Sequence, residues 1–247
     1  MYDVVFCYAF SHLKSERGLE KLLQQGFHPK VIVASPWKKI RASRPDTTAL
    51  PPRKSEKLFH LAEENKIPVL VADIRSAEVA EFLTRIRPHM GVILGARVIP
   101  PKLIDLFSRG IVNAHPGLLP HNRGLNSLEH AVLRKLPQGV SLHYINSEID
   151  AGKFIASKVL DLGERLQVDS VRSLSLSVQI ELLTSASLVE SNQTSDLSGG
   201  HVNPPLTTAD LELFQSRWPK YLKDYDVIRE QYMDRYLRNK DEGSFEQ

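Results

Sequence analysis

The sequence predicts an α/β fold: a Rossmann-like, mostly parallel sheet with helices on both faces, followed by a helical C-terminal extension. Two observations lead to this class. Short apolar runs alternate with amphipathic stretches of helical period through the first half of the chain. The apolar runs also lack strict alternation of apolar and polar residues, which indicates strands that are covered on both faces.

The first predicted elements form a β-α-β unit. Residues 4–10 are a short apolar run, residues 14–25 carry leucines at helical spacing before Gly26, and residues 30–34 are β-branched. The same two patterns then repeat along the chain. They predict helix 57–65, strand 68–72, helix 77–86, strand 89–94, helix 102–107 and strand 111–114.

The second half of the chain has a different pattern. Residues 140–145 and 154–160 are further strand candidates, and a long helical stretch runs over 169–191. Residues 191–208 are rich in Ser, Thr, Gly and Pro, which is typical of a loop. The tail 211–238 carries aromatic residues spaced by three or four positions, which predicts a helical docking face rather than a base-stacking surface.

Composition narrows the class of protein. With 247 residues, 42% hydrophobic and 25% charged, the chain is ordinary for a globular protein, unlike disordered, collagen-like or membrane-bundle chains. The net charge of +3 does not indicate a nucleic-acid binder, although it suits a phosphorylated small ligand. The single cysteine, Cys7, excludes an internal disulfide and lies in an apolar run, which predicts a buried, inert thiol. We expect a cytoplasmic protein without a signal peptide or membrane span.

A basic, proline-rich segment interrupts the alternation between residues 36 and 55. Its prolines predict a surface loop. A solvated basic loop is the ordinary interpretation, and a loop that grips an anionic substrate is the alternative.

Polar side chains that suit acyl-transfer chemistry follow two of the predicted strands. Asn113 and His115 are two positions apart, so their side chains share one face at the carboxyl end of a strand, where open α/β sheets bind ligands. Asp150 lies in a turn two residues before Gly152, a pattern that is common in turns without any catalytic role. Together the three residues supply an amide donor, a group that titrates near neutrality and a carboxylate.

Three ordered motifs make the chain resemble the folate-dependent formyltransferases, the family of the glycinamide ribonucleotide and methionyl-tRNA formyltransferases. The family has an N-x-H-P-S-L-L-P loop, a Gly-Val-(Thr/Ser)-x-His strand and a (V/I)-D-x-G turn. The matching residues here are Asn113–Pro120, Gly139–His143 and Ile149–Gly152, and 91–100 resembles the strand and loop beside the family's folate pocket. The resemblance covers about residues 1–165. Gly117 stands where Ser is common, and we interpret it as tolerated.

This resemblance implies the formyltransferase fold and transfer of a formyl group from 10-formyltetrahydrofolate, as co-substrate, to a primary amine. It assigns catalysis to Asn113, His115 and Asp150. Asn113 can donate to the developing oxyanion, and His115 can act as imidazolium or in proton transfer. Asp150 can favour the imidazolium and position a water that relays the proton. The folate-binding candidates are Arg97, Val98, Ile99, Ser147, Glu148 and Ile149.

Acceptor-binding candidates come from three places in the chain. They are Tyr8, Phe10, Arg123, Asn126 and His143. Arg123 and Asn126 belong to a stretch that resembles a motif frequent in formyltransferases of polysaccharide clusters, with a surface loop as the alternative. For His143 we favour a structural or substrate-pocket role over direct catalysis. No residues have metal-ligand spacing, so we expect no metal site.

The acceptor is inferred from family features that this chain lacks. The stretch after the first strand has no glycine-rich phosphate loop, which disfavours a purine-pathway substrate. The C-terminal pattern is helical, which disfavours the barrel domain of the tRNA enzymes. An amino sugar of a nucleotide-linked sugar for surface polysaccharide is the preferred acceptor. The alternatives are an amino acid or hydroxylamine side chain in secondary metabolism and, from a different class, a noncatalytic formyltransferase-like binding module.

These inferences give a domain organisation and a set of partners. Residues 1–165 are the predicted catalytic domain, and residues 166–247 are a helical extension that packs on the core or forms a homodimer interface. The expected partner is a small-molecule amine, with no nucleic acid and no membrane span.

Overall fold

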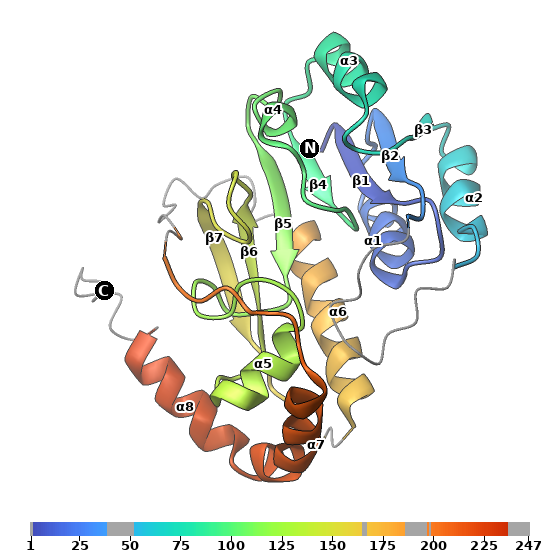
Figure 1. The fold of residues 1–247 in the computed structure, drawn as a ribbon. Coiled ribbons are helices and arrows are strands. Elements are labelled where there is room, and N and C mark those ends of the chain that lie inside the picture. Colours follow the sequence, from blue (N-terminus) through green and yellow to red (C-terminus); the bar gives the residue numbers. More distant parts are fainter. Residues whose placement is uncertain (1, 39–51, 165–166, 186–196, 198, 237–247) are drawn as a thin grey trace.

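Seven strands form one sheet in the computed structural model, which describes residues 2–38, 52–164, 167–185, 197 and 199–236. The strand order is β3-β2-β1-β4-β5-β6-β7 (Figure 1). The strands are β1 Val4–Tyr8, β2 Val31–Ser35, β3 Val69–Val71, β4 Gly91–Ile93, β5 Ile111–His115, β6 Gly139–Tyr144 and β7 Phe154–Val159. β1 to β5 are parallel, whereas β6 and β7 add antiparallel to one edge. The predicted, mostly parallel sheet is confirmed.

Helices connect the strands close to where the sequence predicts them. They are α1 Leu13–Gln24, α2 Glu56–Glu64, α3 Ala77–Ile86, α4 Pro101–Ile104, α5 Ser127–Arg134, α6 Val168–Thr184, α7 Thr208–Lys223 and α8 Tyr225–Tyr236. Polar residues cap several of them: the side chains of Ser55 and Ser76 accept backbone N–H groups at the starts of α2 and α3. Such caps satisfy N–H groups that the first turn of a helix leaves without an internal partner.

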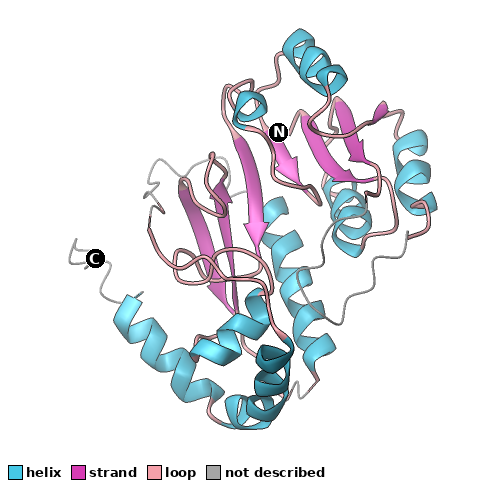
Figure 2. Cartoon of the chain, in the orientation of Figure 1, coloured by secondary structure: helices cyan, strands magenta, loops and turns pink. Residues whose placement is uncertain are grey.

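The two faces of the sheet bury two apolar clusters. Alternate residues of β1 point to opposite sides: Val5 and Cys7 join the larger cluster, while Val4 and Phe6 join the smaller one. The larger cluster includes side chains of α1, α2, α5, α6 and α7, and the smaller cluster includes side chains of α3 and α4. Helices therefore cover both faces, as predicted (Figure 2). Cys7 is buried, and burial raises the pKa of its thiol.

The C-terminal helices pack on the sheet formed by β1 to β7. The predicted helix 169–191 ends at Thr184, and residues 186–191 lie outside the described residues. The aromatic tail forms two helices rather than one, because α7 ends at its C-cap residue, Asp224. Trp218 and Tyr225 belong to the larger cluster, and Tyr225 Oη donates to the Leu160 carbonyl at 2.8 Å. The predicted docking face of the tail thus contacts the core of its own chain. The domain boundary at residue 165 stays a prediction.

The basic, proline-rich loop is described only at its ends. Residues 39–51 lie outside the described residues. At the near end, the Lys38 ammonium lies 2.7 Å from Asp73 Oδ2, and the Lys38 carbonyl accepts Arg97 Nη2 at 2.7 Å. This end of the loop is therefore tied to the segments that follow β3 and β4.

Candidate active site

The carboxyl end of β5 carries Asn113 and His115 on one face of the sheet. Ile111, at the start of the same strand, lies in the smaller apolar cluster, so by alternation Asn113 and His115 point to that side. The same cluster contains side chains of α3 and α4. In the antiparallel pairing, Asn113 lies opposite His143 and His115 lies opposite Ser141. The spacing of the two residues predicts this shared face correctly.

Asp150 meets His115 across the turn that joins β6 and β7. The distance from Asp150 Oδ2 to His115 Nδ1 is 3.2 Å, and the same oxygen accepts the Gly124 N–H at 2.9 Å. Burial raises the pKa of the Asp150 carboxyl, but the His115 ring and the Gly124 N–H outweigh burial and hold that pKa at about 2. Asp150 has a φ of 44°, in the left-handed region that Asp tolerates better than most residues. The turn therefore presents an ionised carboxylate to the imidazole.

The other ring nitrogen of His115 faces the loop that follows β5. His115 Nε2 lies 2.8 Å from the Asn122 carbonyl oxygen and 3.3 Å from Ser127 Oγ, and that hydroxyl donates to the Gly124 carbonyl. Both ring nitrogens thus face acceptors, an arrangement that fits an imidazolium, which donates from both.

Gly117 lies against this hydrogen bond. A Cβ atom at position 117 would lie 2.5 Å from the Asn122 carbonyl oxygen and 2.8 Å from His115 Nε2. The interpretation of Gly117 as merely tolerated is therefore wrong, because the backbone here leaves no space for a side chain.

His143 orients the amide of Asn113. Its Nδ1 lies 3.0 Å from the Tyr144 carbonyl and 3.1 Å from the Ala151 carbonyl, so Nδ1 carries the proton and Nε2 is an acceptor. Asn113 Nδ2 is 3.5 Å from that Nε2. Burial lowers the pKa of His143 to about 4, although Asp150 opposes the shift, so the ring is neutral. The His143 residue is 0% exposed, and its predicted role in the substrate pocket stays a prediction.

Lys14, which the sequence analysis does not single out, holds the other end of the Asn113 amide. Its ammonium donates to the Ala114 carbonyl at 2.7 Å and lies 3.5 Å from Asn113 Oδ1. Desolvation lowers the pKa of Lys14 to about 8, although Asp150 raises it. Lys14 also lines a cavity of about 420 Å³ with Ser11, His12, Leu13, Leu176 and Gln179.

The predicted folate residues differ in exposure. Val98 and Ile149 are exposed apolar side chains, and Ser147 and Glu148 lie in the same exposed turn as Ile149. Arg97 is tied to the Lys38 carbonyl, and the Ile99 side chain is buried in the smaller apolar cluster. Any contact that Ile99 makes with a ligand is therefore through its backbone.

Among the acceptor candidates, Arg123 is bonded through its guanidinium to other groups of the protein. Its Nε donates to the Ile149 carbonyl at 2.8 Å, its Nη1 donates to the Gly199 carbonyl, and its Nη2 lies 3.2 Å from Glu148 Oε2. The residue is 5% exposed. The guanidinium thus contacts three groups of the protein, and its predicted contact with the acceptor stays a prediction.

The remaining acceptor candidates occupy two separate places. The rings of Tyr8 and Phe10 stack with centroids 4.6 Å apart at the carboxyl end of β1. Asn126 is half-buried with a φ of 55° and directly precedes α5. Their roles in binding an acceptor stay predictions.

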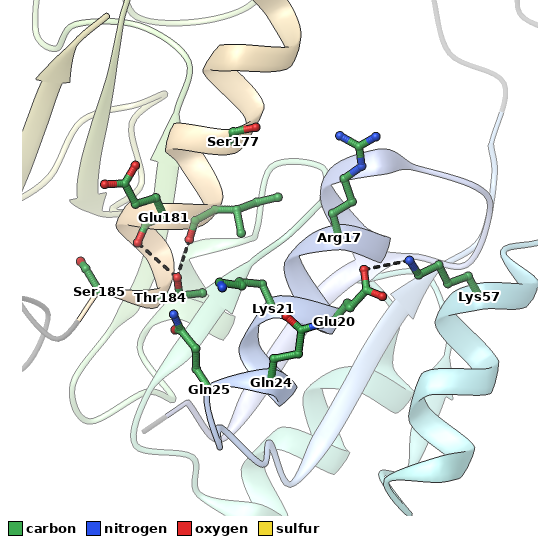
Figure 3. A pocket seen from close by; sticks show the side chains of 11 residues that line it. Arg17, Glu20, Lys21, Gln24, Gln25, Lys57, Ser177, Glu181, Thr184 and Ser185 are labelled. Atoms are coloured by element: carbon green, nitrogen blue, oxygen red, sulfur yellow. Dashed lines mark hydrogen bonds and ion pairs between the residues drawn. The ribbon is translucent and has the colours of Figure 1, made fainter.

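A larger cavity of about 650 Å³ lies away from these residues, between α1, α2 and α6. Figure 3 shows its polar lining, in which Glu20 and Lys57 form an ion pair of 2.8 Å. None of Asn113, His115 and Asp150 lines it. Within the described residues, no three His, Cys, Asp or Glu side chains are grouped as metal ligands, and no helix is long and apolar enough to cross a membrane.

Comparison with known proteins places these residues in a family. The family described as Formyl transferase matches residues 51–186, more than half of the chain. Methionyl-tRNA formyltransferase from Porphyromonas gingivalis is 27% identical over 150 residues, which cover 59% of this chain and 44% of the relative. The chain spans about half or less of the length of the curated relatives it matches.

Two solved structures share the fold. Phosphoribosylglycinamide formyltransferase from Bacillus halodurans superimposes with a TM-score of 0.58 at 20% identity, over 77% of this chain and 96% of that chain. A sugar N-formyltransferase from Shewanella sp FDAARGOS_354 superimposes with a TM-score of 0.58 at 17% identity, over 87% of each chain. At these identities the likeness establishes the fold, and the predicted fold class is confirmed.

Proposed function

Because the chain belongs to the formyl transferase family, we propose that it transfers a formyl group from 10-formyltetrahydrofolate to a primary amine. The observation that carries the proposal is the convergence of Asn113, His115 and Asp150, with the His115 ring 3.2 Å from the Asp150 carboxylate. An amide, an imidazole and a carboxylate at one sheet edge are the groups that this chemistry requires.

The electrostatic demands of the reaction match these side chains. Attack of an amine on the formyl carbonyl places negative charge on oxygen and positive charge on nitrogen. Asn113 Nδ2 has two hydrogens, of which His143 accepts one; the second has no acceptor among the described residues and can donate to the oxyanion. The ring of His115, at the same end of β5, is the second group that we propose to stabilise this negative charge. Lys14 and His143 hold the amide in place, so little reorganisation is needed as the charge develops.

The proton lost by the attacking amine needs an acceptor. Asp150 Oδ2 is occupied by His115 and Gly124, whereas Oδ1 lies 3.9 Å from His143 Nε2 and has no hydrogen bond within the described part of the chain. Oδ1 is therefore the oxygen that can hold a water molecule and relay the proton from the amine to the nitrogen that leaves with tetrahydrofolate. Collapse of the tetrahedral adduct then releases the formamide and tetrahydrofolate.

We further propose that the acceptor is the amino group of a nucleotide-linked sugar. The sugar N-formyltransferase structure aligns with 87% of this chain, including residues beyond the matched family region. The stretch after β1 also lacks the glycines of a phosphate loop. For the co-substrate, the exposed side chains of Val98 and Ile149 are the surfaces that we propose to pack against the aromatic part of the folate. The alternative acceptor is an amino acid or hydroxylamine side chain in secondary metabolism.

The test is a turnover assay with the purified protein, 10-formyltetrahydrofolate and a panel of amino-sugar nucleotides. We expect release of tetrahydrofolate only when an acceptor amine is present. Release without any acceptor indicates a hydrolase instead. If 10-formyltetrahydrofolate produces no thermal shift, the noncatalytic binding module is favoured. The homodimer and the cytoplasmic location stay predictions.

A further inference from the structure

An extended segment, residues 199–206, runs alongside the loop that contacts His115 (Figure 1). The Arg123 N–H donates to the His201 carbonyl at 3.0 Å, and the Asn203 N–H donates to the Arg123 carbonyl at 2.8 Å. Arg123 and Val202 form a parallel bridge between the two stretches. This segment follows the matched family region, so it adds to the site from a part of the chain that the family model does not include.

The side chain of Asn203 is buried against this loop, with the residue 8% exposed. Its Nδ2 donates to Asn122 Oδ1 at 2.8 Å and to the Leu125 carbonyl at 3.1 Å. Both of these atoms are acceptors, which fixes the orientation of the Asn203 amide with its nitrogen toward them.

Asn122 is the link between Asn203 and the imidazole. Its buried side chain accepts from Asn203 through Oδ1 and donates through Nδ2 to the Ser127 carbonyl at 2.9 Å. Its main-chain carbonyl receives His115 Nε2 at 2.8 Å. A buried acceptor that loses its donor is unfavourable, so removing the Asn203 amide favours rearrangement of residue 122. The carbonyl that faces His115 is the main-chain carbonyl of Asn122, so it moves when Asn122 rearranges.

We propose that Asn203 is a positioning residue for His115: it holds Asn122 so that the Asn122 carbonyl receives Nε2 and the imidazole keeps Nδ1 toward Asp150. Asn203 does not touch the imidazole and acts through Asn122. The expected effect on turnover rests on the proposed function, whereas the effect on the ring does not.

The kinetic test is the variant Asn203→Ala. We expect kcat to fall about 10- to 100-fold with little change in KM for 10-formyltetrahydrofolate, because a displaced catalytic group costs turnover rather than ground-state binding. The matched control is Asn65→Ala, which removes a side-chain hydrogen bond to the Leu61 carbonyl at the end of α2. A kcat for Asn203→Ala that equals that of the control overturns the proposal.

A second readout does not need turnover. Nitrogen-15 NMR of the histidine rings reports the Nε2–H of His115, assigned with the variant His115→Gln. Asn203→Ala should shift this resonance and speed its exchange with water about tenfold or more, while Asn65→Ala leaves it in place. An unchanged His115 resonance contradicts the proposal even if no acceptor is found. If the resonance moves but no amine is formylated, the positioning role stands and the proposed function fails.

A double-mutant cycle separates positioning from a general loss of structure. In the background of Asn122→Ala, adding Asn203→Ala should change kcat by less than about twofold, because the link is already broken. If the fold-loss in kcat of the double variant equals the product of the losses in the two single variants, Asn203 does not act through Asn122. If Asn203→Ala does not fold, the isosteric Asn203→Asp replaces the donor by an oxygen that faces two acceptors, and the same losses are expected.

Discussion

Oδ2 of Asp150 lies 3.2 Å from Nδ1 of His115, although His115 is the last residue of β5 and Asp150 lies in the turn between β6 and β7. The contact joins the end of β5 to that turn, and Arg123, in the loop after β5, donates to the Ile149 carbonyl of the same turn. The antiparallel strand β6 pairs with β5 and leads directly into that turn. The ion pair is therefore a product of sheet topology and of the loop contacts that close over it.

Asp150→Asn should show whether the carboxylate charge is needed. The substitution keeps the shape of the side chain but removes the negative charge that supports the imidazolium and the oxygen that relays the proton. We expect kcat to fall by about 10²- to 10⁴-fold. His115→Ala should show a loss of similar size while remaining folded. Steady-state kinetics and thermal unfolding of both variants provide the check, and near-normal rates in either contradict its assigned role.

Lys14 should set an alkaline limit to activity. With a pKa of about 8, its ammonium loses the proton as pH rises through 8, and the hydrogen bonds it donates near Asn113 lose the support of the positive charge. We expect kcat to decline above that pH, and Lys14→Arg to remove the decline because the guanidinium stays charged. Lys14→Met should be slow at every pH. If kcat declines above pH 8 in Lys14→Arg as it does in the wild type, the decline belongs to another titrating group.

His143 should destabilise the protein in mild acid. Its pKa is about 4 when folded and 6.5 ordinarily, so the unfolded chain binds the proton first and the free energy of unfolding falls as pH drops from 6.5 to 4. The shift corresponds to roughly 3 kcal/mol. The pKa of Asp150 is lowered from 3.8 to about 2, so its contribution to the free energy of unfolding is lost only as the pH falls from 3.8 to 2.

Urea unfolding of the wild type and of His143→Gln at pH 7 and pH 4.5 measures this contribution. The wild type should lose more stability between the two pH values than the variant does. His12, whose pKa burial lowers to about 4, changes stability in the same direction but is present in both proteins. Equal losses in the two proteins exclude the contribution from His143.

Arg123→Met should act on stability before it acts on acceptor binding. The substitution leaves the carbonyls of Ile149 and Gly199 without their donor, which should cost about 1–3 kcal/mol for each group that stays buried. Turnover should fall with it, since Asp150 follows Ile149 in the same turn. The check is urea unfolding beside KM for the acceptor. An increase in KM for the acceptor at unchanged stability supports the predicted contact between Arg123 and the substrate.

The sequence by itself determines the layered α/β fold, because the periodicity of apolar residues encodes which face each element buries. It also determines that Asn113 and His115 share a face, since alternation along a strand is a local property. The motifs around these residues and Asp150 identify the family. By contrast, Gly117 looks merely tolerated in the sequence, and only the folded loop shows the Asn122 carbonyl lying against it.

Only the tertiary structure decided which groups surround the three site residues. Lys14, the Asn122 carbonyl and the Asn203 amide reach the site through contacts between segments far apart in the chain. The partners of Arg123, the carbonyls of Ile149 and Gly199, are likewise brought near it only by folding. Hydrogen bonds to backbone carbonyls leave no pattern of residue types, because every residue offers the same carbonyl and its position is set by how the loops pack.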